Sequence, residues 1–131
     1  MHDTDSLKAA KMEGNSAQDG LATAKQEVAT AKQEVATAEQ KVATAKQEVV
    51  TAKQEVATAK QEVATAVDDA AKATAEENLR FALRNRKSAQ RVLESAISIL
   101  ESATRNQVLH EKTLQRLLDQ QLGNLQKQNF C

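Results

Sequence analysis

The sequence predicts an all-α fold: an elongated antiparallel hairpin of two long helices, packed as a coiled coil. The 131 residues include no Pro and only three Gly, which leaves few positions for tight turns. A seven-residue unit repeats through the first half, and a weaker form of it runs through the second half in a shifted frame. Because 24 residues are alanine, we expect thin helix packing and no thick globular core.

The first repeat has the unit ATAKQEV and covers residues 22–66. Valine and alanine alternate in it at spacings of three and four, which is the seam of a coiled-coil helix. The valines of this seam are Val28, Val35, Val42, Val49, Val56 and Val63. Ala, Lys, Gln and Glu favour helix, so we expect one helix over residues 21–68.

The second half carries larger apolar residues in the same kind of frame. Leu93 and Leu100 each begin the tetrapeptide Leu-Glu-Ser-Ala, which has the form of Val-Ala-Thr-Ala in the first repeat. Extending this frame predicts a seam and its edge at Leu79, Leu93, Ile97, Leu100, Leu114 and Leu118. We therefore expect a second helix over residues 75–122.

The two frames differ by two residues, so one straight helix would turn its seam by about 200° between them. A turn over residues 69–74 removes this conflict. Asp68 and Asp69 disfavour a helix interior, and Thr74 with Glu77 fits a capping box at the start of the second helix. The alternative is one continuous helix of about 100 residues in an oligomeric coiled coil, because residues 70–73 also favour helix.

Glycines suggest where the arms end. Gly20 precedes the first predicted helix, and Gly123 suits the stop of the second. We therefore expect residues 1–20 and 123–131 to be flexible segments.

A hairpin predicts which residues meet across the two arms. For a pairing centred on Asp69, the numbers of paired residues sum to 138. Val42 then meets Ala96, and Ala45 meets Leu93. Nearly every layer combines one large and one small side chain, which is the arrangement that a close-packed core needs.

Few residues suggest a ligand. The four basic residues Arg80, Arg84, Lys87 and Arg91 share one helix face and form a candidate anion-binding face, with a solvated flank as the alternative. The net charge of zero argues against a general polyanion binder. His110 falls at the edge of the seam without a second ligand nearby, and Cys131 is the only cysteine, so we expect no metal and no cofactor.

The sequence indicates a non-catalytic structural or interaction module, a rigid spacer or a helix-docking surface. It offers no nucleophile with a paired base and no Gly-rich phosphate loop, and a two-helix rod should lack a concave pocket, so we expect no enzyme and no small-molecule substrate. The expected partner is a helical protein or a second copy. A dimer would use the apolar residues outside the seam, which are Ile99, Val108, Leu109 and Leu122.

A different class of function stays open. The chain is similar to late embryogenesis abundant proteins in its use of Ala, Lys, Glu and Thr, although their repeats usually have eleven residues. The alternative is therefore a conditionally disordered, amphipathic polypeptide that protects under stress or binds an anionic surface. The sequence has no signal peptide and no apolar stretch of 18 residues, so we expect a soluble intracellular protein without nucleic-acid or membrane partners.

Overall fold

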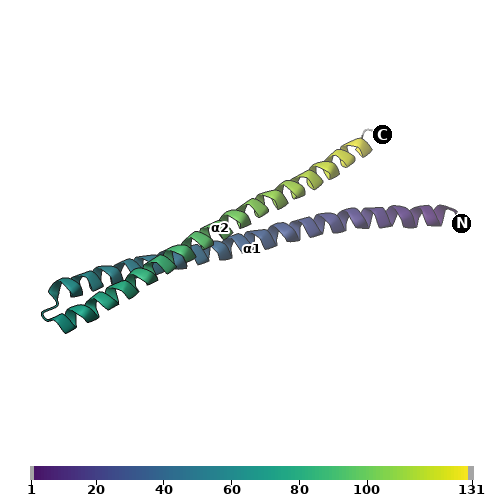
Figure 1. Cartoon of the computed structure of the whole chain (residues 1–131). Helices are drawn as coiled ribbons and strands as arrows, with labels where there is room; N and C mark the ends of the chain where they lie inside the picture. The colour runs from purple at the N-terminus through teal and green to yellow at the C-terminus, as the bar shows by residue number, and fades with distance from the viewer. Residues whose placement is uncertain (1, 130–131) are drawn as a thin grey trace. The chain divides into compact units, whose positions relative to one another are not determined.

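The computed structural model describes the backbone of residues 2–129 and the side chains of residues 18–126. Helix α1 spans His2–Thr65 and helix α2 spans Asp69–Asn129, with a short connection over residues 66–68 (Figure 1). The described part of the chain contains no strand, and the two helices pack against each other. The fold is therefore an all-α two-helix hairpin, which confirms that prediction over the continuous helix.

The turn lies earlier in the chain than the sequence predicts. Asp68 caps α2: its Oδ1 accepts a hydrogen bond from the Ala71 N–H at 2.7 Å, and its carbonyl accepts one from the Lys72 N–H at 2.9 Å. The predicted capping box is wrong, because the Thr74 hydroxyl donates to the Ala70 carbonyl inside the helix, at 3.1 Å. The helix-forming residues 70–73 extend α2 back to Asp69, so the predicted turn at 69–74 is helical.

The helices are also longer at their outer ends than predicted. Residues 2–20 belong to α1, and α2 continues past Gly123 to Asn129. Neither Gly20 nor Gly123 has the positive φ of a glycine helix stop, so neither marks a boundary. Cys131, whose role the sequence left open, lies outside the described residues.

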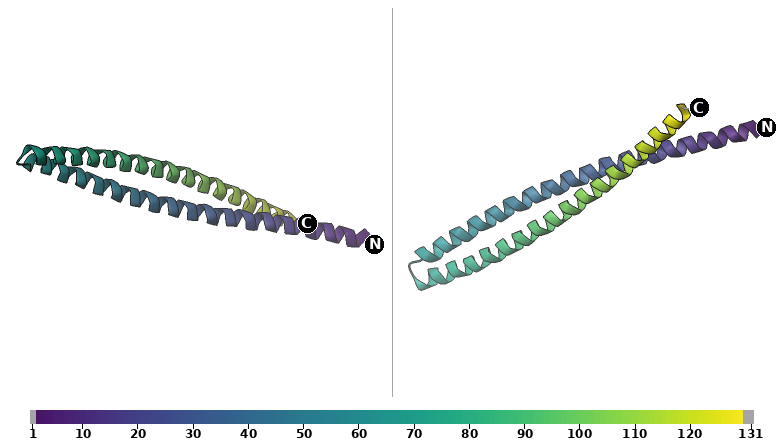
Figure 2. Two further views of the ribbon diagram at one scale, coloured as in Figure 1. Left: turned by 60° about the horizontal axis from the view of Figure 1, so that its bottom comes forward. Right: turned by 90° about the horizontal axis from the view of Figure 1, so that it is seen from above.

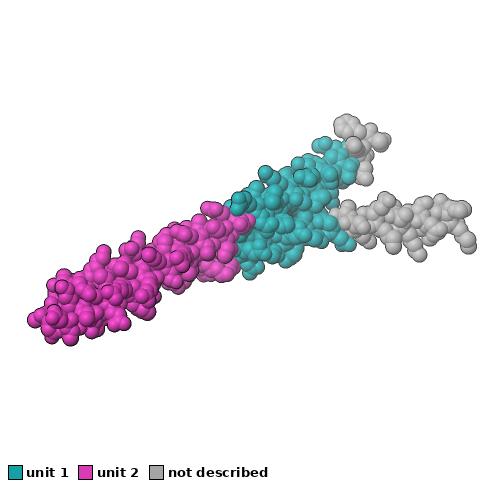
Figure 3. Space-filling model, in the orientation of Figure 1, with its two compact units in different colours: residues 1–35, 103–131 teal, residues 36–102 magenta. Residues whose placement is uncertain are grey.

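The chain divides into two compact units, and each takes a part of both helices (Figure 3). Unit 2, Ala36–Ser102, contains the turn and the adjoining arms. Unit 1 consists of Met1–Val35 and Ala103–Cys131. Within unit 2 the two arms run side by side from the turn, as both views in Figure 2 show.

The core of unit 2 is built from two small clusters, each with one valine and two alanines buried and two leucines packed against them. In one cluster Val42, Ala45 and Ala96 are buried, with Leu93 and Leu100 packed against them. In the other Val56, Ala59 and Ala82 are buried, with Leu79 and Leu83 against them. Both clusters contain residue pairs whose numbers sum to 138, as the hairpin pairing predicts. Alternating large and small residues lets the helices approach closely without voids.

Unit 1 has a thinner core. Ala24, Val28 and Ala31 are buried on its α1 segment. On its α2 segment Gln107, His110, Leu114 and Leu117 occupy the matching 3–4 spacing and are only partly buried. Two of these four are polar, so the unit buries less apolar surface per turn than unit 2.

Candidate helix-docking surface

The predicted seam residues lie where the two helices of each unit meet. Val28, Val42, Val49 and Val56 are buried, while Val35, Val63, Leu79, Leu93, Leu100 and Leu114 are partly buried. Ile97 and Leu118 sit at the edge, each 37% exposed. The seam therefore lies between the two helices of the hairpin, where most of its side chains are covered.

A second apolar row runs along α2 in unit 2, outside the seam. Val92 is 51% exposed and Ile99 is 55% exposed, seven residues apart. Serines lie between and beside them, so that the row reads Ser88, Val92, Ser95, Ile99 and Ser102, and all five are exposed. We call these five residues the α2 stripe. Their 4-3-4-3 spacing places them on one face of the helix.

Val92, Ser95 and Ile99 of the α2 stripe line one wall of an open groove of about 760 Å³ in unit 2. The floor of the groove includes the buried alanines Ala45 and Ala96, and the wall on α1 includes Lys41, Thr44 and Glu48. The expectation of no concave pocket is therefore wrong for unit 2. The groove exists because alanine fills so little of the space between the helices, a consequence of the repeat itself.

Sequence reasoning singled out Ile99 but missed Val92 and the groove. The available signal was the second 3–4 row in the second half, in which apolar residues and serines alternate without a charge. That signal is weak beside the heptad seam, which has more apolar residues and repeats more regularly. The charged residues that line the groove are Lys41, Glu48 and Arg91, and its lining includes no His or Cys.

The predicted basic residues Arg80, Arg84, Lys87 and Arg91 are all exposed on α2 in unit 2. Within the described part of the chain, none of them forms an ion pair. The four cations thus lie close together on one helix and have no anionic side chain paired with them in the described part of the chain. Their charges point to solvent, and Arg91 also reaches the rim of the groove.

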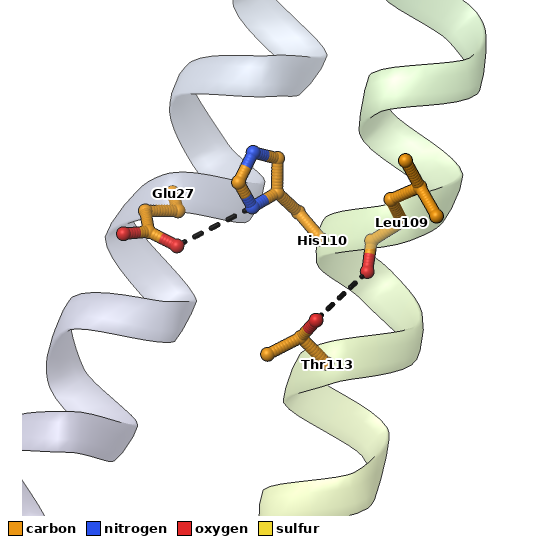
Figure 4. Close-up of polar contacts among 4 residues, drawn as sticks. All are labelled: Glu27, Leu109, His110 and Thr113. Atoms are coloured by element: carbon orange, nitrogen blue, oxygen red, sulfur yellow. Dashed lines mark hydrogen bonds and ion pairs between the residues drawn. The ribbon is translucent and has the colours of Figure 1, made fainter.

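Unit 1 contains a polar contact across its two helices (Figure 4). His110 Nδ1 lies 3.3 Å from Glu27 Oε2, and the two side chains are 30% and 50% exposed. The contact is an ion pair when the imidazole is protonated. Among the residues that the structure describes, no three His, Cys, Asp or Glu side chains are grouped so that they could hold a metal ion.

Comparison of the chain with protein-family models, curated proteins and solved structures finds no match. Within the described part of the chain, no helix combines the length and the hydrophobicity that crossing a bilayer requires.

Proposed function

We propose that the chain is a non-catalytic interaction module whose unit 2 groove binds one further α-helix. The observation that carries this proposal is the exposure of Val92 and Ile99 beside a groove floored by alanine. Exposed apolar side chains rimmed by polar residues are typical of interaction sites. A helix that covers them would remove apolar surface from water, at about 25 cal/mol for each Å².

The shape of the surface favours a helix as the occupant. Val92 and Ile99 are separated by two helical turns, with the small Ser95 between them. The small Ser95 lets a partner helix approach closely, so that apolar side chains of the partner pack beside Val92 and Ile99. Recognition of an amphipathic helix by an apolar groove is a common binding mode.

The groove can act as a docking surface only if the hairpin is folded before the partner arrives. The packed clusters of unit 2 support this order of events. Circular dichroism of the full chain in dilute buffer should therefore give a helical spectrum and a cooperative thermal transition. A coil spectrum in the same buffer would favour the conditionally disordered alternative.

A model peptide tests the docking itself. The probe is a fluorescein-labelled synthetic helix, acetylated and amidated, with Val and Ile at 3–4 spacing and Ser between them. We expect its fluorescence anisotropy to rise on adding the full chain. Ile99→Glu should weaken the binding at least about tenfold, because it places a charge in the apolar contact. Val50→Glu is the matched control, since Val50 is 48% exposed in unit 2 and does not line the groove. Equal binding by both variants contradicts the proposal.

A second candidate function rests on the four exposed basic residues of α2. They would attract an anionic surface, and the attraction should fall steeply as salt is added. Co-sedimentation of the full chain with vesicles of phosphatidylcholine, with and without phosphatidylserine, tests this function. Binding that depends on phosphatidylserine and is lost in Arg84→Gln with Arg91→Gln supports it. Absence of binding at low salt rules it out.

A further inference from the structure

We infer that the unit 2 groove is covered by the same face of a second copy of this chain, with α2 lying on α2 of the partner subunit and a two-fold axis at the level of Ser95. This inference rests on the proposed function and names its partner. Three features coincide at that level: the symmetry of the α2 stripe, the centre of the groove, and the one repeat in which the charges are reversed.

The first feature is the internal symmetry of the α2 stripe. Ser88 and Ser102 lie seven residues on either side of Ser95, and Val92 and Ile99 lie three and four residues from it. In a two-fold symmetric contact the same patch meets itself, so the apolar residue on one side must face the apolar residue on the other. Antiparallel α2 helices that cross at Ser95 bring Val92 to the height of Ile99 of the partner subunit.

The second feature is the position of the groove. Paired residues in unit 2 sum to 138, so Ser95 lies level with residue 43 of α1, between the buried Val42 and Ala45. The groove is lined by residues 37–48 of α1 and 91–99 of α2, whose midpoints lie at the same level. An axis at Ser95 therefore stacks the two grooves directly on each other.

The third feature is a pair of opposite charges on the α1 wall of the groove. In five repeats the residue before valine is glutamate on α1 (27, 34, 48, 55 and 62), and in one repeat it is Lys41. An axis level with residue 43 brings Lys41 within one helical turn of Glu48 of the partner subunit, and this pair occurs twice by symmetry. An axis between Lys41 and a neighbouring glutamate pairs opposite charges, whereas an axis between two of the glutamates would bring glutamate to glutamate.

The direction of the axis follows from the same residues. An axis parallel to the helices would lay Lys41 and Glu48 onto Val92 and Ile99 of the partner subunit, and desolvating these charges against apolar groups is costly. An axis across the helices lays α1 on α1 and α2 on α2. The two hairpins then lie antiparallel, with their turns at opposite ends of the contact.

Sedimentation equilibrium of the full chain tests this arrangement, with a reducing agent to keep Cys131 from cross-linking copies. We expect a reversible monomer–dimer equilibrium. Ile99→Glu should raise the dimer dissociation constant at least about tenfold, whereas Val50→Glu should leave it unchanged. A wild-type chain that stays monomeric, or a dimer that is insensitive to Ile99→Glu, overturns the inference. Circular dichroism confirms that each variant is folded.

Charge reversal tests the position of the axis. Lys41→Glu and Glu48→Lys should each raise the dissociation constant, by about threefold to tenfold from two lost exposed pairs. The double variant should restore the wild-type value, because each pair is re-formed with its charges exchanged. Failure of this rescue overturns the axis at Ser95. Binding of the model peptide to a chain that never dimerises overturns self-recognition alone and leaves the docking function standing.

Discussion

Ala45 of α1 and Leu93 of α2 pack in one hydrophobic cluster, although 48 positions separate them in the sequence. Ala45 is almost wholly buried, and Leu93 packs against its cluster from the opposite helix. This pair identifies the register of unit 2, because a shift by one heptad would bring Leu93 to a different alanine of the repeat. The same pair allows the hairpin to be tested by a disulfide cross-link.

Cysteines at Ala45 and Leu93 should form a disulfide within one chain. The change is Ala45→Cys with Leu93→Cys in a Cys131→Ser background. Facing residues in a layer of two close-packed helices fall within the range of Cα separations that a disulfide can bridge. Non-reducing electrophoresis and mass spectrometry after mild oxidation should show a cross-linked monomer.

The matched control for this cross-link is Ala45→Cys with Ser98→Cys. Ser98 is exposed on the same stretch of α2 and lies outside both the core cluster and the groove. It should not form an intrachain disulfide. A cross-link of Ala45→Cys with Leu93→Cys that forms only between chains would contradict the hairpin.

Removing the cap of α2 should destabilise the turn. Asp68→Ala deletes the carboxylate that accepts a hydrogen bond from the Ala71 amide. We expect the free energy of unfolding to fall by about 1 kcal/mol, the usual cost of a lost N-cap. Thermal or urea unfolding followed by circular dichroism measures this change. Asp68→Asn keeps an acceptor and should lose less, whereas an equal loss in both variants would argue against the cap.

The register of the hairpin could be predicted from the sequence, and the position of the turn could not. Side-chain volume predicts layers such as Val42 opposite Ala96 and Leu93 opposite Ala45, and the pairing centred on Asp69 selects this register among those that differ by a heptad. The turn depends on where two helix-compatible segments are interrupted. Residues 70–73 favour helix strongly, so a competition between the caps at Asp68 and Thr74 decided the boundary, and the earlier cap prevailed.

The groove could not be predicted from the sequence either, because its apolar wall on α2 lies outside the heptad seam. Heptad reasoning assigns each residue to the strongest seam, and Val92 and Ile99 lie beside that seam. Whether Val92 and Ile99 line a groove depends on which α1 residues lie opposite them. The groove forms where Ala45 and Ala96, from neighbouring layers, leave space between the helices, and this place is known only once the register is known.

Gly123→Ala distinguishes the observed end of α2 from the predicted one. Gly123 lies inside the helix, has no positive φ, and has open space where a Cβ would project. Alanine should therefore stabilise the chain by about 0.5–1 kcal/mol, because it restricts the unfolded state and favours helix. Gly20→Ala, in equally open space in α1, should act in the same direction. A helix that stopped at Gly123 would instead be destabilised by alanine, as chemical unfolding would reveal.

Replacing His110 should strengthen the packing in unit 1. His110 occupies a seam position, is 30% exposed, and contacts Glu27 at 3.3 Å. The Glu27 carboxylate is half exposed and stays solvated without this contact, so little is lost when the imidazole is removed. His110→Leu places an apolar side chain against the α1 seam, and we expect about 1 kcal/mol of added stability and a higher Tm. His110→Gln, which is polar and of similar length, should show no such gain. A lower Tm for His110→Leu would mean that the contact with Glu27 contributes more to unit 1 than its exposure suggests.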